Sequence, residues 1–213
     1  EMCFPFESKE EESDNQDADI KSDTIAQIAE TVKIAIRQGQ GDILIFQSGE
    51  REIQETIEVL KGLKLNNTTI LPLYARLSSA QQQLIFKDMV GRKIVVSTNV
   101  AETSITVPNI RFVIDTGFHK ISRYNYINKL HRLEIEPISW ASHVQRKGRC
   151  GRVGPGIYYA LFSKDDLERR AEFTDPEILR TSLATVILNL LDLKIKDVRH
   201  FHFIDAPNYK YIK

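Results

Sequence analysis

Four cationic side chains are concentrated in one short, glycine-containing segment of the sequence. This segment, QRKGRCGRVGPG (residues 145–156), contains Arg146, Lys147, Arg149 and Arg152. Guanidinium groups bind phosphate oxygens through paired hydrogen bonds, so such a cluster suits a strongly anionic ligand. The more common role of a basic cluster is a solvated helix face, and the residue spacing has to be weighed against that alternative.

Spacing and glycine content favour an anion site. Gln145, Arg149 and Arg152 stand at i, i+4 and i+7, so in a helix they would share one face. Gly148 and Gly151 each disfavour a helix by about 1 kcal/mol relative to Ala, and a merely solvated face has little use for them. Close approach to a ligand or a partner backbone does call for glycine. We therefore expect this segment to meet a nucleotide phosphate or a nucleic-acid backbone.

A second candidate segment is rich in hydroxyl groups and directly follows an expected strand. It reads STNVAETSITVP, and its polar side chains include Ser97, Thr98, Asn99, Thr103, Ser104 and Thr106. Such groups, together with backbone N–H groups at a helix start, suit phosphate oxygens. Capping and turn formation are an equally common use of these residue types, so spacing alone leaves both roles open.

A third candidate segment, LYARLSSAQQQLIF, contains one cation and one aromatic side chain of interest. Arg76 falls in an expected strand-to-helix loop, where it could meet a phosphate. Phe86 follows Leu84 and Ile85 on an expected helix, and a core position is its simplest interpretation.

The elements that must position these residues alternate between strands and helices. Strands are expected over 42–46, 69–74, 93–98, 111–115 and 156–162, and helices over 25–36, 49–63 and 78–90. Strands that are apolar on both faces and alternate with amphipathic helices indicate a parallel sheet covered on two sides. The predicted fold class is therefore α/β, doubly wound. Such sheets bind ligands beyond the carboxyl ends of their strands, where all three candidate segments begin or lie.

Three stretches depart from this alternation. Residues 7–23 are acidic and free of aromatics, which favours a solvated linker. Residues 121–136 are expected to form a protruding β-hairpin that carries several basic residues. Residues 173–193 are expected to form one apolar helix with Thr174 or Asp175 as N-cap and Pro176 at its first position. The predicted domains are thus 1–23, 24–172 and the start of a truncated domain over 173–213.

Bulk composition limits the possible functions. The 29 basic and 29 acidic residues give zero formal net charge, so any anion site has to be local. Cys3 and Cys150 are isolated, which favours a reducing, cytoplasmic compartment over a disulfide framework. His200 and His202 lack a third ligand nearby, so no metal site is expected. No apolar run approaches the length of a membrane span.

Two nucleotide-binding motifs do not occur in the sequence. There is no G-x-x-x-x-G-K-[ST] phosphate loop, and no D-E-x-H run follows a strand to hold magnesium. We therefore expect that this chain alone neither binds ATP tightly nor hydrolyses it. A Rossmann-type cofactor enzyme is disfavoured because no G-x-G-x-x-G follows the first strand.

Taken together, the candidate segments resemble the DEAH-box helicases of superfamily 2. TNVAETS and QRKGRCGR are similar to that family's motifs V and VI, and DILIFQSGEREI, LPLYARLSSAQQQ and VIDTGFHK resemble its motifs IV, IVa and Va. The segments EPISWASHVQRKGRCGRVGPG and EFTDPEILRTSLATVIL are close to the bacterial HrpA-like branch. The resemblance extends from Gly41 onward and implies a second RecA-like domain followed by the start of a winged-helix region.

The resemblance also implies an activity. In this family ATP, with Mg2+, binds in the cleft between two RecA-like domains, and hydrolysis drives 3′-to-5′ movement along single-stranded RNA. The implied partners are therefore single-stranded RNA, or an RNA duplex with a 3′ overhang, and a first RecA-like domain in cis. No membrane partner is implied, and the expected state is a monomer.

Residue roles follow from the matching motif positions. Gln145 corresponds to the residue that orients the attacking water, Arg149 and Arg152 to the arginine fingers, and Gly148 to a nucleotide contact. Further matches, given as a set, are nucleotide contacts at Ser104 and Phe86 and RNA contacts at Arg76, Thr98 and Asn99.

The chain departs from the family pattern at two positions. Pro108 stands where many eukaryotic members carry an acid, so that ribose contact is not expected here. Cys150 replaces a small residue, and we interpret it as a space-filler. An alternative function is a non-catalytic RNA-binding or regulatory module that retains the helicase fold.

Overall fold

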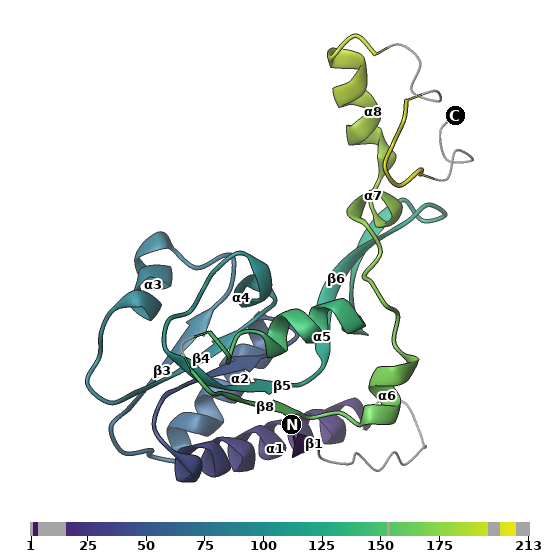
Figure 1. The fold of residues 1–213 in the computed structure, drawn as a ribbon. Helices are drawn as coiled ribbons and strands as arrows, with labels where there is room; N and C mark the ends of the chain where they lie inside the picture. Colours follow the sequence, from purple (N-terminus) through teal and green to yellow (C-terminus); the bar gives the residue numbers. More distant parts are fainter. Residues whose placement is uncertain (1, 4–15, 153, 196–200, 208–213) are drawn as a thin grey trace. The chain divides into compact units, whose positions relative to one another are not determined.

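The computed structural model describes residues 2–3, 16–152, 154–195 and 201–207 (Figure 1). Its main feature is a parallel sheet in the order β1-β8-β5-β2-β4-β3. These strands are β1 (Met2–Cys3), β8 (Ile157–Ala160), β5 (Ile110–Asp115), β2 (Asp42–Phe46), β4 (Arg92–Ser97) and β3 (Thr68–Leu73). Every neighbouring pair is parallel. The predicted α/β fold with a RecA-like sheet is confirmed.

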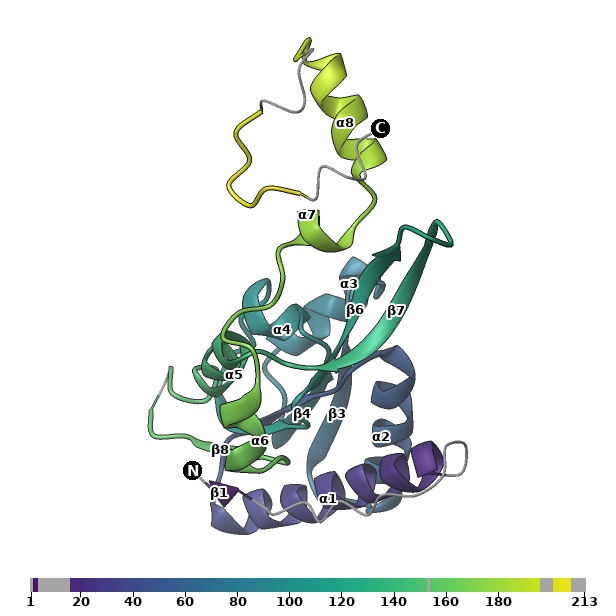
Figure 2. The same ribbon diagram turned by 90° about the vertical axis from the view of Figure 1, so that its right-hand side faces the viewer.

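Two apolar clusters cover the two faces of this sheet. On one face α1 (Gln16–Gln38) and α2 (Glu50–Gly62) pack Ile28 and Ile53 against Ile45 and Val96. The other face carries α3 (Ser79–Gln83), η1 (Leu84–Phe86), α4 (Val100–Thr103), α5 (Trp140–Lys147) and α6 (Lys164–Arg169). Figure 2 shows α2 on the side of the sheet away from α5. Because successive strand residues point to opposite faces, uninterrupted apolar runs such as DILIF supply both clusters.

The chain divides into two compact units. The first comprises residues 1–119 and 137–173 and contains the parallel sheet. The second comprises residues 120–136 and 174–213. It includes the outer part of the hairpin β6 (Phe118–Asn125) and β7 (Leu130–Pro137), together with α7 (Glu177–Arg180) and α8 (Leu183–Asp192). In the part of the chain that the structure describes, no helix has the length and apolar character to cross a bilayer.

The second unit is held together by polar contacts between the hairpin and the segment around α7. Arg123 donates to both carboxylate oxygens of Glu136 and, at 3.0 Å, to Asp175 Oδ2. The Tyr126 hydroxyl donates to the carbonyl of Thr181 at 2.9 Å. The predicted β-hairpin at 121–136 is confirmed, and these contacts attach it to the chain that follows the first unit.

Three sequence-based expectations about local structure are wrong. The segment expected as a linker over 7–23 contains the start of α1, which begins at Gln16, while 7–15 lie outside the described residues. Acidic residues are favoured near a helix N-terminus, so an acidic stretch is compatible with a helix start. The helix expected over 78–90 ends at Phe86, and Ser78 and Gln81 form a capping box at its start.

The third wrong expectation is the single helix over 173–193. It is divided into α7 and α8 by Thr181 and Ser182, which both have extended backbones. The Ser182 hydroxyl accepts a hydrogen bond from the N–H of Ala184, so it caps a new helix rather than continuing the old one. Pro176 is the N-cap of α7, one position earlier than expected.

Neighbouring backbone atoms leave no room for a side chain at Gly156, so one added methyl group there should lower stability. A Cβ at Gly156 would lie 1.9 Å from the carbonyl oxygen of Cys150 and 2.8 Å from that of Arg111, whereas a Cβ at Gly154 would meet nothing within 4 Å. We expect Gly156→Ala to lower the free energy of unfolding by about 1–3 kcal/mol, the usual range for overpacking. Urea denaturation measures this, and Gly154→Ala, the matched control, should stay within about 0.5 kcal/mol of the parent.

Candidate functional site at the carboxyl ends of the strands

Parts of the three candidate segments lie at the carboxyl ends of the strands. The strands are parallel, so the segments that follow β2, β3, β4 and β5 all leave from their carboxyl ends. Polar side chains are buried at this edge. Ser97 is the last residue of β4, and Gln47, Ser48 and Thr116 directly follow β2 or β5. This edge is where open α/β sheets bind their ligands.

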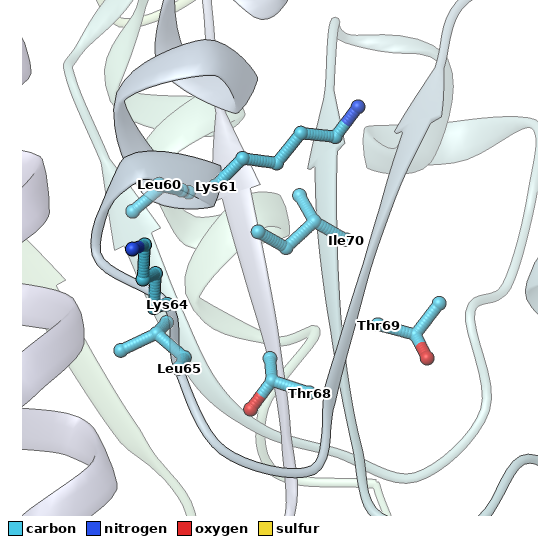
Figure 3. Close-up of a pocket in the computed structure, with 7 residues that line it drawn as sticks. All are labelled: Leu60, Lys61, Lys64, Leu65, Thr68, Thr69 and Ile70. Carbon is cyan, nitrogen blue, oxygen red and sulfur yellow. The ribbon is translucent and has the colours of Figure 1, made fainter.

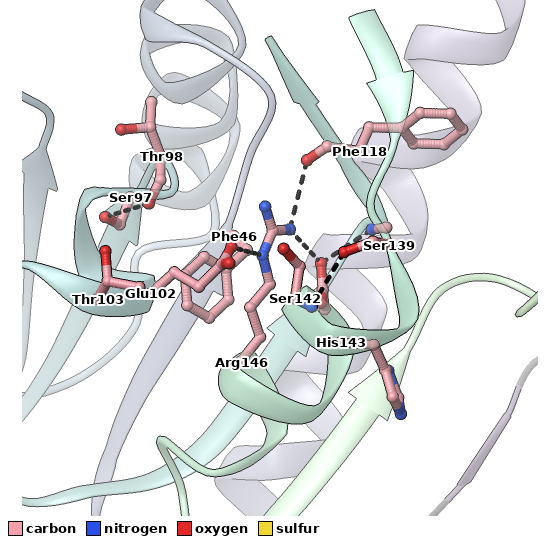
Figure 4. A network of polar contacts seen from close by, with 12 residues as sticks. Phe46, Ser97, Thr98, Glu102, Thr103, Phe118, Ser139, Ser142, His143 and Arg146 are labelled. Carbon is pink, nitrogen blue, oxygen red and sulfur yellow. Dashed lines mark hydrogen bonds and ion pairs between the residues drawn. The ribbon is translucent and has the colours of Figure 1, made fainter. Parts of the chain in front are cut away.

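The hydroxyl-rich segment forms a short loop and the single turn of α4. Thr98 N–H donates to the carbonyl of Leu73 at 3.1 Å, which ties the loop to the end of β3. The Ser97 hydroxyl is turned inward and donates to the carbonyl of Thr98 at 2.8 Å (Figure 4). Ser97 therefore has a structural role, whereas several polar side chains that follow it are exposed.

The outward-facing groups of this loop are not used as helix caps. Asn99 is the N-cap of α4, but its side chain makes no capping hydrogen bond. Asn99, Thr103, Ser104 and Thr106 are exposed, and Thr98 is half-buried. The capping role that the sequence left open is thus not the role of Asn99, and its amide is available to a ligand at this edge.

We had expected the basic segment to present one helical face, and this expectation is wrong. α5 ends at Lys147 with Gly148 as C-cap, and the Arg149 N–H closes a turn onto the carbonyl of Arg146 at 3.0 Å. Gln145 is on the exposed face of the helix, while Arg149 and Arg152 follow its end. The two glycines explain the difference, because poor helix formers stop the helix before the second and third residues of the predicted face.

Gly148 has an ordinary helical backbone and modest steric freedom. A Cβ there would lie 3.4 Å from the carbonyl oxygens of Val144 and Gln145, and one at Gly151 would meet nothing within 4 Å. Neither glycine is therefore required by contacts within the described fold. Their small size leaves open space beside the two arginines.

Arg149 is a cation with incomplete compensation. It is only 9% exposed, and its Nε has no hydrogen-bond partner among the described residues. Burial lowers the pKa of its guanidinium, the neighbouring Arg152 lowers it further, and Glu102 raises it in part. A bound anion would relieve both the burial penalty and the repulsion.

Arg152 is exposed and joins the two candidate segments. Its Nη1 donates to the Thr106 hydroxyl at 2.9 Å. A guanidinium carries five N–H donors, so this contact leaves others free to bind a further group. The structure therefore brings Arg149, Arg152 and the hydroxyl-rich loop together.

Arg76 and Phe86 belong to the connection between β3 and β4, in which Arg76 follows the carboxyl end of β3 and Phe86 lies near the amino end of β4. Arg76 lies in the expected loop, is exposed, and pairs with Glu50 at 3.6 Å. Phe86 lies in η1 and is 51% exposed, so the core position favoured by its spacing is wrong. Ile85 is the buried residue of that turn instead.

Sequence reasoning counted Arg146 in the basic cluster but missed its buried, structural role at this edge. It is fully buried, and its Nε donates to Glu102 Oε2 and its Nη1 to Asp115 Oδ1, each at 2.8 Å (Figure 4). Nη1 also donates to the carbonyl of Phe118 at 3.3 Å, and the guanidinium lies 4.7 Å from the centre of the Phe46 ring. Burial lowers the pKa of Arg146, but Asp115 and Glu102 outweigh it and raise that pKa overall.

The Asp115 carboxylate extends this network into the core. Its Oδ1 accepts from the N–H of Gly117 at 2.9 Å and its Oδ2 from the Tyr158 hydroxyl at 2.7 Å. Burial and the nearby carboxylate raise the pKa of Tyr158, which keeps the phenol protonated as a donor. The Tyr158 oxygen is also 3.0 Å from His143 Nδ1. The signal that could have revealed Arg146 is the presence of acids within or directly after apolar segments, at Glu102 and Asp115.

A separate hollow of about 330 Å³ lies between the end of α2 and the start of β3 (Figure 3). It is lined by Leu60, Lys61, Lys64, Leu65, Thr68, Thr69 and Ile70. This is the amino end of β3, so the hollow lies away from the carboxyl edge and includes none of the predicted site residues. No group of three potential metal ligands occurs among the residues that the structure describes, and His200 lies outside them.

Comparison with known proteins gives consistent matches. A family model described as the helicase conserved C-terminal domain matches residues 24–154. The chain is 53% identical over 195 residues to the ATP-dependent RNA helicase HrpA of Escherichia coli K12, covering 92% of this chain and 15% of that protein. It is 56% identical over 176 residues to an HrpA homolog of Haemophilus influenzae, covering 83% of this chain and 14% of the relative.

Solved structures agree with these sequence matches. The fold superposes on the E. coli DExH-box NTPase HrpB with a TM-score of 0.82 and 31% identity, covering 99% of this chain and 25% of that one. A second structure, of the E. coli DEAH/RHA helicase HrpB, gives a TM-score of 0.80 and 34% identity over 87% of this chain and 24% of that one. The chain thus spans a quarter or less of the proteins it matches here.

The buried Arg146 network predicts a large loss of stability when its cation is removed. Arg146→Met would leave Glu102 and Asp115 buried without their counter-ion, which costs about 3–5 kcal/mol when one partner of a buried pair is lost. Chemical denaturation measures this loss. The control is Arg152→Met, which removes an exposed guanidinium from the same segment and should change stability by about 0.5 kcal/mol or less. A similar small change for both variants would contradict the assigned role of Arg146.

Proposed function

This chain belongs to the helicase conserved C-terminal domain family, in its DEAH-box, HrpA-like branch, and on that premise we propose that it forms the second half of an ATP-driven RNA-unwinding motor. In this proposal a first RecA-like domain of the same protein supplies the phosphate loop and the acidic residues that hold Mg2+. The winged-helix region would begin at residue 173. The single observation that carries the proposal is Arg149, a nearly buried guanidinium whose Nε lacks a partner among the described residues.

The two arginines fit the needs of phosphoryl transfer. When bound, ATP supplies the reactive phosphoanhydride, and negative charge then spreads over the equatorial oxygens of the transferred group. Arg149 is already desolvated, so its interaction with that charge would be stronger than in water. Arg152, exposed beside it, would provide further N–H donors. Both cations would thus stabilise the transferred phosphoryl group from the side opposite the phosphate loop.

Gln145 and Gly148 would complete the nucleotide side of the site. Gln145 is exposed on α5, one turn before Arg149, and its amide can orient a water molecule for in-line attack. Gly148, at the end of that helix, leaves space for the phosphates beside Arg149. Ser104 is assigned to the link between nucleotide and RNA, because it is exposed on the loop that also contains Thr106, the partner of Arg152.

The remaining predicted residues would bind RNA and the base of the nucleotide. Thr98, Asn99 and Arg76 offer a hydroxyl, an amide and a guanidinium at the carboxyl edge, which are groups that contact phosphate and sugar without reading sequence. Phe86 presents half of its surface to solvent and would stack on the base. We further propose 3′-to-5′ movement on single-stranded RNA, a monomeric state and a cytoplasmic location.

The finger role of Arg149 predicts a selective kinetic defect. In the intact helicase, Arg149→Ala should lower kcat about 10³-fold or more, because an arginine finger contributes that much to phosphoryl transfer. RNA affinity should be nearly unchanged, since the residue faces the nucleotide. Steady-state ATPase assays with saturating RNA measure kcat, and Lys147→Ala is the control, an exposed cation of the same segment. Near-normal turnover for Arg149→Ala would reject the finger role.

The backbone role of Thr98 predicts a loss of RNA affinity that does not depend on sequence. Thr98→Val keeps the shape of the side chain and removes its hydroxyl, so binding should weaken by a similar factor for RNAs of different sequence. Filter binding with several oligonucleotides measures this. Thr69→Val, the same change at the amino end of β3, should leave affinity unaltered. A loss confined to particular sequences would argue against a backbone contact.

A further inference from the structure

A lysine side chain is buried beneath the turn that presents Phe86. Lys93 lies on β4 and is only 4% exposed. Its Nζ donates to the carbonyl of Ile85 at 2.9 Å and to that of Lys87 at 3.3 Å, and it lies 3.8 Å from Asp42 Oδ2. The ammonium group thus donates to two main-chain carbonyls and has one carboxylate within ion-pair distance.

Burying the Lys93 ammonium group costs free energy that a buried apolar side chain would not cost. Removing an ammonium ion from water carries a penalty of several kcal/mol, and an apolar side chain of similar volume would fill the same space without it. What only the ammonium provides is hydrogen bonding to carbonyls at the end of η1. Such carbonyls have no partner within the helix and favour a nearby cation.

The carbonyls that Lys93 binds lie on either side of Phe86. The Ile85 carbonyl belongs to the peptide group that precedes Phe86. The peptide group that follows Phe86 is held as well, because the Lys87 N–H donates to the carbonyl of Leu84 at 3.3 Å. Both peptide planes next to Phe86 are therefore fixed, and with them the direction of its Cα–Cβ bond.

The burial of neighbouring side chains shows the result of this restraint. Ile85 is fully buried in the apolar cluster that also contains Val95, two residues after Lys93 on the same face of β4. Phe86 is 51% exposed. Without the ammonium, the short turn could rotate and bury the larger ring, since burying an aromatic side chain is favourable.

We propose that Lys93 is a positioning residue for base binding, which holds the Leu84–Lys87 turn so that the Phe86 ring faces the nucleotide. This inference rests on the proposed stacking role of Phe86. Lys93 itself is buried and touches neither base nor phosphate. Its loss should therefore weaken the contact with the base and leave the phosphate contacts of Arg149 and Arg152 intact.

The test compares a ligand that has a base with one that lacks it. In the intact helicase, the double variant Asp42→Asn/Lys93→Met removes both buried charges, and the Asn oxygen can still accept the Lys93 N–H bond that Asp42 Oδ1 accepts at 2.8 Å. We expect KM for ATP to rise about tenfold, within the range for loss of one stacked base, with kcat changed less than twofold. The inhibition constant of inorganic tripolyphosphate, which has no base, should be unchanged.

Two further variants make the outcome specific. Asp42→Asn alone keeps both carbonyl contacts of Lys93 and should leave KM for ATP unaltered. Phe86→Ala should raise KM by at least as much as the double variant, and adding the double variant to it should produce no further rise. This pattern supports the inference, because it shows that Lys93 acts through Phe86.

The opposing outcomes are distinct. If Phe86→Ala raises KM and the double variant does not, the positioning role is wrong and the proposed function stands. An unchanged KM for Phe86→Ala would reject the base contact itself, and the inference with it. A parallel rise for ATP and tripolyphosphate would mean that Lys93 supports the fold only, which also overturns the inference. If the double variant does not fold, Asp42→Asn/Lys93→Gln, which retains one donor, is judged by the same two constants.

Discussion

The buried ion pairs of Arg146 are the interaction on which the carboxyl edge of the sheet depends. A fully buried guanidinium is tolerated only with good geometry and hydrogen-bonded partners, and here Glu102 and Asp115 provide both. Glu102 belongs to α4, next to the hydroxyl-rich loop, and Asp115 ends β5. One side chain therefore fixes α5 against the loop after β4 and against the strand that leads toward β6. Any shift of α5 would have to carry this charge network with it.

Two buried arginines of the same basic segment differ in how far carboxylates compensate their charge. Arg146 has two carboxylates and a carbonyl, so its charge is compensated within the protein, although its Nη2 has no hydrogen-bond partner among the described residues. Arg149, three residues later, is nearly buried, with its Nε unpaired among the described residues and another cation beside it. The first arrangement stabilises the fold and the second favours binding of an anion. The exposed Arg152, bonded to Thr106, connects the proposed anion site to the loop that we propose binds RNA.

Two neighbouring residues of η1 show a similar difference between a structural and a proposed functional role. Ile85 packs into the core, and the neighbouring Phe86 is held outward by a turn whose carbonyls are bonded to a buried lysine. In both places a buried cation lies close to a residue proposed to bind the nucleotide, Arg146 close to Arg149 and Lys93 close to Phe86. This pattern places rigid support beneath the groups assigned to nucleotide binding, which is what a site needs to hold a ligand in one geometry.

The sequence by itself determined the α/β class, the strands, the β-hairpin and the segments that form the candidate site, because apolar runs and turn residues act over short distances along the chain. It also determined the family through the residues of those segments. It did not determine that α5 stops at Lys147, that residues 173–193 form two helices, or that Phe86 is exposed while Ile85 is buried. Nor did it identify Arg146 or Lys93 as buried cations. Their partners, Glu102, Asp115, Asp42 and the carbonyls of η1, are brought close only by the packed sheet, since charge compensation in a protein interior depends on distance in space and not on separation in sequence.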